Sequence, residues 1–321
     1  MPLIDLPFEK LLTYQGSNPL PEKFDSFWNQ GLSEMRALKH NVELKRAAFQ
    51  TPFAECFDMT FTGTGGARVY AKLLKPKNSK KPHPAVLNFH GYSGASSEWT
   101  SYLSYVAAGF VVAALDCRGQ GGQSEDVGGV IGGTLRGHII RGLKGPVENL
   151  YYRHVFLDTA LLAKIVMEMP EVDPTRVGAF GGSQGGGLTL ACVALVPEIK
   201  RAAPTYPFLC DYLRVWKMDQ AKDAYWELQD YFRKFDPQHK KEDEVFLKLG
   251  HIDVQHLCPR IKAEVLMGVG LMDTICPPST QFAAYNKITS KKAYQIFPDF
   301  GHEGLPGFSD EVFQFMLGLL S

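Results

Sequence analysis

The residues Arg176-Val177-Gly178-Ala179-Phe180-Gly181-Gly182-Ser183-Gln184-Gly185 contain the most informative pattern in this chain. Its first five residues predict a buried strand, and the small and apolar residues that follow, up to 196, predict a helix. A serine flanked by glycines between a strand and a helix is a nucleophile elbow, a turn so sharp that only glycine fits beside the serine backbone. The elbow presents the Ser183 hydroxyl at the carboxyl end of a strand. A G-x-S-x-G match also arises by chance, so its meaning depends on partners elsewhere in the chain.

Strands and helices alternate on both sides of this elbow. Two early strand-like runs, 55–62 and 68–74, are joined by Gly63-Thr64-Gly65-Gly66, which is a hairpin signal. The later strand-like runs are 84–89, 110–115, 200–204, 263–269 and 293–297, and the helix-like runs are 97–108, 152–169 and 309–320. Such alternation is typical of a mainly parallel sheet with helices on both faces. The expected fold class is therefore α/β, in the α/β-hydrolase form that the elbow indicates.

Length alone allows one or two domains, and we expect a single domain with three additions. The chain has 321 residues, of which 45% are hydrophobic, and can bury one large core, so we expect a single domain over 1–321. Residues 1–50 predict an amphipathic helical arm, and about 123–150 is a glycine-rich tongue. The aromatic and charged stretch of about 206–259 predicts a helical insertion. Loops of this length inside a compact domain are usually functional or interfacial.

Charge and cysteine content exclude several classes of protein. Lys plus Arg equals Asp plus Glu at 34 each, which gives no electrostatic reason to bind nucleic acid or an anionic membrane. No apolar stretch is long enough for a membrane span, and the N-terminus lacks the apolar core of a signal peptide. The six cysteines form no C-x-x-C pair, so neither a zinc site nor a disulfide framework is expected. We expect a cytoplasmic protein.

A serine hydroxyl needs a histidine to take its proton and a carboxylate to fix the histidine tautomer. In the α/β-hydrolase layout the chain order is serine, acid, histidine. Asp273 follows the strand-like run 265–269, and His302 follows the run 294–297. Both lie just beyond strand carboxyl ends, where α/β sheets place their ligands. The order and placement predict a Ser183, Asp273, His302 triad.

Other residues compete for these roles. His251 and His256 precede the Asp273 strand, and His90 precedes the serine, where it fits an oxyanion loop better. Asp299 is a rival acid, but it lies only three residues from His302, a spacing that would strain a bond to the ring. Glu303 is interpreted as a loop or partner contact rather than a proton carrier.

The oxyanion requires two backbone N–H donors that are held in place before charge develops. Gln184, directly after the nucleophile, supplies one of them at a helix N-terminus. Tyr92, in the loop after the strand at 84–89, is the candidate for the other, and its ring is suited to wall the acyl pocket. Arg118 follows another strand; we interpret it as a structural tie between loops rather than an anion clamp. The glycines after it do not form a G-x-G-x-x-G dinucleotide motif.

Three motifs occur in a characteristic order: Arg118-Gly119-Gln120, Gly181-Gly182-Ser183-Gln184-Gly185-Gly186 and His302-Glu303. With them, the chain resembles the acetyl xylan esterase / cephalosporin C deacetylase family (carbohydrate esterase family seven). The likeness covers nearly the whole chain, including the Phe-x-x-Phe-Trp helix at 24–28, and no motif position departs from it. The resemblance implies a catalytic triad, which falls on Ser183, His302 and Asp273. The two oxyanion donors that it implies fall on Tyr92 and Gln184. It also implies structural residues near the site, which fall on Arg118, Gln120 and Glu303.

The resemblance also implies a reaction and an assembly. It implies a serine esterase that removes acetyl groups from acetylated xylo-oligosaccharides and related small acetyl esters such as cephalosporin C, through an acetyl-enzyme and without a metal or organic cofactor. It further implies a cytoplasmic, ring-like homohexamer whose active sites face an inner chamber and whose contacts involve the tongue. Two alternatives stay open: a related serine hydrolase with another acyl or peptide specificity, and a non-catalytic scaffold with the same fold.

Overall fold

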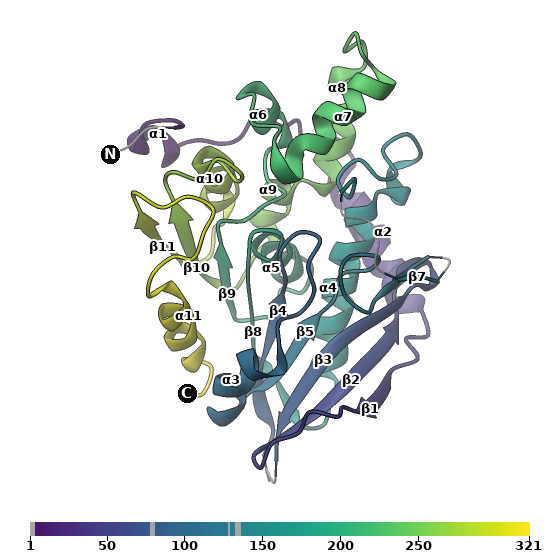
Figure 1. Ribbon diagram of the computed structural model, residues 1–321, viewed down its shortest axis with the longest axis vertical. Helices are drawn as coiled ribbons and strands as arrows, with labels where there is room; N and C mark the ends of the chain where they lie inside the picture. The colour runs from purple at the N-terminus through teal and green to yellow at the C-terminus, as the bar shows by residue number, and fades with distance from the viewer. Residues whose placement is uncertain (1–3, 78–80, 128, 132–135) are drawn as a thin grey trace.

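A nine-stranded sheet forms the centre of the molecule, here a computed structural model that describes residues 4–77, 81–127, 129–131 and 136–321 (Figure 1). The strand order is β1-β2-β3-β5-β4-β8-β9-β10-β11. The strands from β5 to β11 are parallel, and β1, β2 and β3 join them antiparallel at one edge. The sheet strands are β1 (Glu43–Arg46), β2 (Ala54–Thr62), β3 (Arg68–Pro76), β4 (His83–Phe89), β5 (Val111–Leu115), β8 (Val172–Gly182), β9 (Arg201–Thr205), β10 (Glu264–Gly270) and β11 (Lys292–Phe297).

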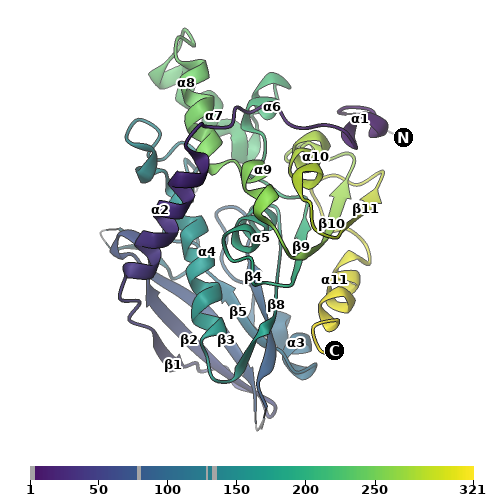
Figure 2. The same cartoon turned by 180° about the vertical axis from the view of Figure 1, so that it is seen from behind.

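Helices cover both faces of this sheet, as the alternating pattern predicts. Figure 1 shows α3 and α11 in front of the strands, and Figure 2 shows α2, α4 and α5 on the other face. The longer helices are α2 (Phe24–Ala37), α4 (Tyr151–Met167), α5 (Gln184–Leu195), α10 (Pro278–Lys287) and α11 (Phe308–Leu317); α1 (Phe8–Leu11) and α3 (Leu103–Ala107) are short. The predicted mainly parallel α/β sheet is confirmed.

Strand side chains alternate between the two layers of core. On β4, Leu87 packs in the cluster that contains α2, α4 and α5, whereas Val86 packs in the cluster beneath α3 and α11. This period of two is what a strand with both faces covered requires. Burial of these apolar side chains contributes about 25 cal/mol per Å² of apolar surface. Because both faces of the sheet are packed in this way, the strands and their ends are held in place.

The long segment between β9 and β10 forms helices. They are α6 (Tyr212–Lys217), α7 (Trp226–Phe235), α8 (Glu242–Leu249) and α9 (Val254–Leu257), with the short 3-10 turns η4 (Asp223–Tyr225), η5 (Gly250–Ile252) and η6 (Cys258–Arg260). Figure 1 shows α6, α7 and α8 together at the top of the molecule. Asp211, at the start of α6, accepts hydrogen bonds from the Tyr14 hydroxyl and the Asn18 N–H, both at 2.8 Å, and so holds the N-terminal arm against this segment.

Two sequence predictions were wrong in detail. Residues 43–46 lie inside the predicted helical arm but form the edge strand β1, whose four exposed residues pair antiparallel with β2. Their order comes from backbone pairing, and charged side chains are typical of an edge strand. The helix predicted over 97–108 is divided into the 3-10 turn η2 (Trp99–Tyr102) and α3.

The tongue at about 123–150 contains a small hairpin of β6 (Glu125–Asp126) and β7 (Val130–Ile131), and the 3-10 turn η3 (Val147–Asn149). Its residues 128 and 132–135 lie outside the described part of the chain. A last 3-10 turn, η1 (Thr64–Gly66), connects β2 to β3. In the described ranges, no helix has both the length and the apolar character needed to cross a membrane.

Candidate active site

The nucleophile elbow lies between β8 and α5. Ser183 has φ +57° and ψ −121°, a backbone conformation that a residue with a side chain adopts only where the surroundings impose it. A Cβ on Gly181 would come within 2.5 Å of the Phe89 carbonyl oxygen, and a Cβ on Gly185 would overlap the same oxygen. Glycine is required at both positions because α5 starts in direct contact with the end of β4.

Ser183, His302 and Asp273 form a continuous hydrogen-bonded chain. His302 Nε2 lies 2.9 Å from Ser183 Oγ, and His302 Nδ1 lies 2.8 Å from Asp273 Oδ2. Asp273 follows β10 and His302 follows β11, and these strands are parallel neighbours, so their carboxyl ends bring the two loops together. The Tyr206 ring packs on the imidazole with a centroid distance of 4.7 Å.

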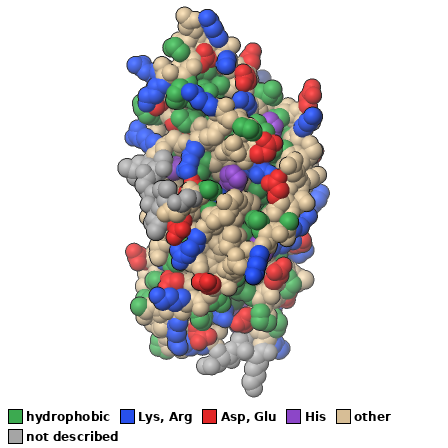
Figure 3. All heavy atoms as spheres, turned by 90° about the vertical axis from the view of Figure 1, so that its right-hand side faces the viewer, with side chains coloured by type: hydrophobic (Ala, Val, Ile, Leu, Met, Phe, Trp, Pro, Cys, Tyr) green, Lys and Arg blue, Asp and Glu red, His purple; other side chains and the backbone are tan. Residues whose placement is uncertain are grey.

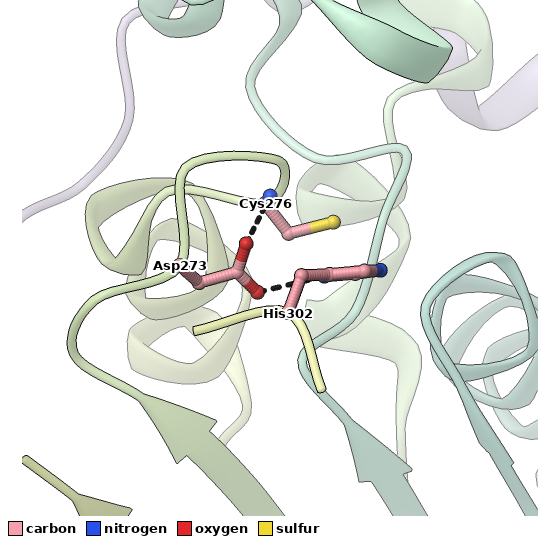
Figure 4. Close-up of side chains that lie close together, drawn as sticks. All are labelled: Asp273, Cys276 and His302. Carbon is pink, nitrogen blue, oxygen red and sulfur yellow. Dashed lines mark hydrogen bonds and ion pairs between the residues drawn. The ribbon is translucent and has the colours of Figure 1, made fainter. Parts of the chain in front are cut away.

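The contacts of Asp273 determine the histidine tautomer. Asp273 is fully buried, and its Oδ1 accepts hydrogen bonds from the N–H groups of Ile275 at 2.9 Å and Cys276 at 2.7 Å. The other oxygen is thereby turned to His302, as Figure 4 shows. A carboxylate oxygen can only accept, so Nδ1 carries the proton and Nε2 is left to accept from the serine hydroxyl. This arrangement is what nucleophilic attack by a serine needs.

Asp273, Cys276 and His302 hold ligand-type atoms within 4.8 Å of one another, a spacing that a metal centre would also need (Figure 4). The donor chemistry does not favour a cation. The carboxylate oxygens and His302 Nδ1 are already engaged with each other and with backbone N–H groups. Burial raises the pKa of the Cys276 thiol well above its ordinary value, with a further rise from Asp273 and a lowering from its hydrogen bond with Ser183. A protonated thiol is a poor metal ligand.

Gln184 joins the elbow to the loop after β4. It is the first residue of α5, so its N–H has no partner within the helix. Its side chain is fully buried, and Nε2 donates to the carbonyls of His90 and Gly91, each at 3.3 Å. These carbonyls directly precede Tyr92, the other predicted oxyanion donor. The Gln184 side chain thus holds the loop that carries Tyr92 next to the start of α5, where the other predicted donor lies.

Gln120 and Arg118 lie in a buried network behind Gln184. The Gln120 amide donates to Gln184 Oε1 at 2.8 Å and accepts from Gln184 Nε2 at 3.1 Å. Arg118 is 1% exposed and binds Asp158 of α4 through two bonds, at 2.7 and 2.6 Å. The guanidinium also donates to the Thr64 carbonyl at 2.8 Å, so it connects the loop after β5 to α4 and to η1. Its structural role stays a prediction. Sequence reasoning missed Asp158, although an acid in the middle of a largely apolar helix was the signal for a buried ion pair.

The other sequence candidates lie apart from Ser183 or are already engaged. The rings of His251 and His256 pack against Phe27 and Phe24 of α2. His90 Nε2 accepts the Cys117 N–H at 2.9 Å.

The two acidic candidates near His302 are exposed. Asp299, the rival acid, is exposed, and the carboxylate that His302 contacts is that of Asp273. Glu303 is also exposed and accepts the Gly301 N–H at 3.1 Å, which is a contact within the loop.

Charges of both signs are interspersed over the face drawn in Figure 3. A mainly parallel sheet with the serine on a strand–helix elbow, and with histidine and aspartate at the ends of later strands, defines an α/β hydrolase.

The sequence profile of the acetyl xylan esterase (AXE1) family matches residues 1–319, and the chain belongs to that family. This places the chain among the carboxylic ester hydrolases.

Two solved structures and one curated relative are similar to this chain. Acetyl xylan esterase 1 from Thermoanaerobacterium sp. JW/SL YS485 is 59% identical, with 99% of this chain and 100% of that chain covered and a TM-score of 0.96. An acetyl xylan esterase from Paenibacillus sp. R4 is 32% identical, with 98% and 99% covered and a TM-score of 0.91. Acetyl esterase Axe7A of Xylanibacter ruminicola is 26% identical over 87% of this chain, which spans 62% of the length of that relative.

Proposed function

We propose that this chain removes acetyl groups from acetylated xylo-oligosaccharides and related small acetyl esters. The observation that carries the proposal is the hydrogen-bonded chain from Ser183 Oγ through His302 to buried Asp273, at 2.9 and 2.8 Å. The family match and the names of the similar esterases support the choice of acetyl esters. Cephalosporin C is included as a substrate on the family resemblance alone.

The proposed reaction begins when His302 Nε2 takes the proton of Ser183 as Oγ attacks the acetyl carbonyl carbon. The N–H groups of Gln184 and Tyr92 stabilise the oxyanion of the tetrahedral intermediate. His302 then donates its proton to the sugar oxygen as the C–O bond breaks, leaving an acetyl group on Ser183. Water, deprotonated by the same imidazole, releases acetate and restores the serine. Asp273 keeps the imidazole in the tautomer that this sequence needs.

Ser183→Ala tests the proposal. Removal of the nucleophile should lower turnover of acetylated xylan fragments and of cephalosporin C by at least about 10³-fold, because only transition-state binding is left. The thermal unfolding transition should be unchanged, since Ser183 is half-buried and its hydroxyl bonds only within the site. Near-normal activity in the variant would reject the assignment.

Two further measurements separate the alternatives. A series of 4-nitrophenyl esters should show acetate cleaved faster than butyrate or longer chains, and a preference for long chains or for peptides would point to a hydrolase of another specificity. Labelling of the wild type but not of Ser183→Ala by a fluorophosphonate probe should exclude a non-catalytic scaffold, because the probe reports an activated serine.

We also propose a single domain, a hexameric assembly and a cytoplasmic location. The six cysteines are buried and unpaired, which suits a reducing compartment such as the cytoplasm. The hexameric ring rests on the family resemblance, and light scattering in solution tests it: the mass of a monomer would contradict it. A single domain over 1–321 predicts one cooperative unfolding transition.

A further inference from the structure

Glu227 is a buried carboxylate outside the proposed triad. It belongs to α7 and is 2% exposed. Its Oε1 accepts the Tyr92 hydroxyl at 2.5 Å, and its Oε2 accepts the N–H groups of Ile139 at 2.8 Å and Ile140 at 3.1 Å. One side chain therefore joins three segments that are far apart in the sequence: the loop after β4, the second half of the tongue and the helical insertion.

In the described part of the chain, Glu227 has hydrogen-bond donors but forms no ion pair with a lysine or arginine. The phenols of Tyr92, Tyr152 and Tyr212 interact electrostatically with it, and the His138 imidazole lies 4.9 Å from the Tyr92 ring. Burial raises its pKa to about 7, while hydrogen bonds from Tyr92 and from the 137–140 backbone lower it. Burying a carboxylate without a cation is costly, which makes a purely packing role a poor explanation.

Tyr92 is held at both ends. Its ring lies between Phe208, at a centroid distance of 5.6 Å, and His138, at 4.9 Å, and its hydroxyl is fixed by Glu227. The backbone before it is fixed by Gln184, as described above. A donor that stabilises charge in the transition state must be in place before the charge develops. The direction of the Tyr92 N–H therefore depends on both anchors.

We propose that Glu227 is a positioning residue that fixes Tyr92, and with it the second oxyanion donor, while tying the 137–140 segment to the same loop. Glu227 acts through Tyr92 and does not itself contact the reacting atoms. The inference rests on the proposed function, because it assigns Tyr92 the oxyanion role.

Three variants separate positioning from charge. Glu227→Ala removes all three hydrogen bonds. Glu227→Gln can keep them: its amide oxygen accepts the two tongue N–H groups, and its NH2 donates to the Tyr92 hydroxyl oxygen. Tyr92→Phe removes only the anchor of the ring. Tyr70→Phe is the matched control, because Tyr70 is a buried tyrosine whose hydroxyl donates to a carboxylate, Asp58 Oδ1 at 2.6 Å, on β3 and β2.

The measurement is kcat for 4-nitrophenyl acetate per active site labelled by the fluorophosphonate, which discounts unfolded protein. Loss of one oxyanion donor costs about 10² to 10³ in kcat, so a misdirected donor should cost Glu227→Ala about 10- to 100-fold, with KM changed less than about 3-fold. Tyr92→Phe should lose about 3- to 10-fold, and Glu227→Gln and Tyr70→Phe less than about 3-fold. The Glu227→Ala/Tyr92→Phe double variant should be no slower than Glu227→Ala, since both changes release the same anchor.

Each outcome decides the inference. Unchanged kcat per labelled site in Tyr92→Phe and Glu227→Ala, with only a lowered Tm, would show a structural role and overturn it. If Glu227→Ala cannot be purified, full kcat in Tyr92→Phe overturns it alone. Failure of the proposed function is recognised separately, because Ser183→Ala would then retain activity whatever the Glu227 variants do.

Discussion

The substitution Asp273→Asn exchanges one carboxylate oxygen for an NH2 group at a fully buried position, and the surrounding contacts decide which oxygen is kept. The Ile275 and Cys276 N–H groups donate to Oδ1 at 2.9 and 2.7 Å. An asparagine must turn its oxygen toward these two donors, because its NH2 in that place would leave two buried N–H groups without an acceptor. The NH2 group then faces His302 Nδ1, 2.8 Å from the present Oδ2.

This orientation of the asparagine amide reverses the tautomer of the His302 imidazole. Nδ1 must accept from the amide, so the proton moves to Nε2, the atom that lies 2.9 Å from Ser183 Oγ. An Nε2–H cannot take the serine proton, and the variant keeps the site geometry with the wrong tautomer. The same exchange in a serine protease triad costs about 10⁴-fold in turnover, which is about 5.4 kcal/mol of transition-state stabilisation. We expect a loss of that order here.

The assay is hydrolysis of 4-nitrophenyl acetate at neutral pH, with the unfolding transition measured in parallel. Asp299→Asn is the matched control, because Asp299 is an exposed aspartate three residues from His302 and should lose less than about 2-fold. If Asp273→Asn keeps more than about a tenth of the wild-type kcat with an intact fold, the tautomer argument is refuted.

Three other substitutions test the scaffold. Asp158→Asn leaves the buried Arg118 guanidinium without its counter-charge, and should lower the free energy of unfolding in urea by about 3–5 kcal/mol; a loss below about 1 kcal/mol would contradict the role assigned to the pair. Gly185→Ala places a Cβ on the Phe89 carbonyl oxygen, so α5 must move away from β4, and thermal melting should show a destabilisation of at least about 3 kcal/mol, whereas a wild-type Tm would speak against that contact. Because burial raises the pKa of Glu227 from 4.5 to about 7, its contribution to stability is present at low pH and is lost as the pH rises through about 7. Glu227→Gln should therefore lose less stability than the wild type between about pH 5 and pH 8 in urea titrations, and equal losses would count against a raised pKa.

The strands of the central sheet could be predicted because buried strands appear in the sequence as apolar runs. The apolar run at 176–180 lies within β8, and the runs at 84–89 and 293–297 lie within β4 and β11. Asp273 and His302 could be selected from chain order, since parallel strands bring successive loops to one edge. Strand β1 left no such pattern, because its four residues are exposed and only its backbone is ordered by β2.

The supporting residues were harder to find than the triad candidates. Glu227 belongs to an amphipathic helix rich in charge, where an acid is most often on the solvated face. Only the packing of α7 on the loop after β4 shows that this acid is buried against Tyr92. Arg118 was interpreted as a tie between loops, yet its partner Asp158 is 40 residues away, and no short-range spacing relates the two.

The Arg118–Asp158 pair also bears on how the molecule responds to heat. The hydration of charged groups becomes less favourable as the temperature rises, so the cost of holding these two ions out of water declines on heating. Their mutual attraction, together with the bond from Arg118 to the Thr64 carbonyl at 2.8 Å, persists. The region behind the elbow thus weakens less with temperature than a purely apolar core would.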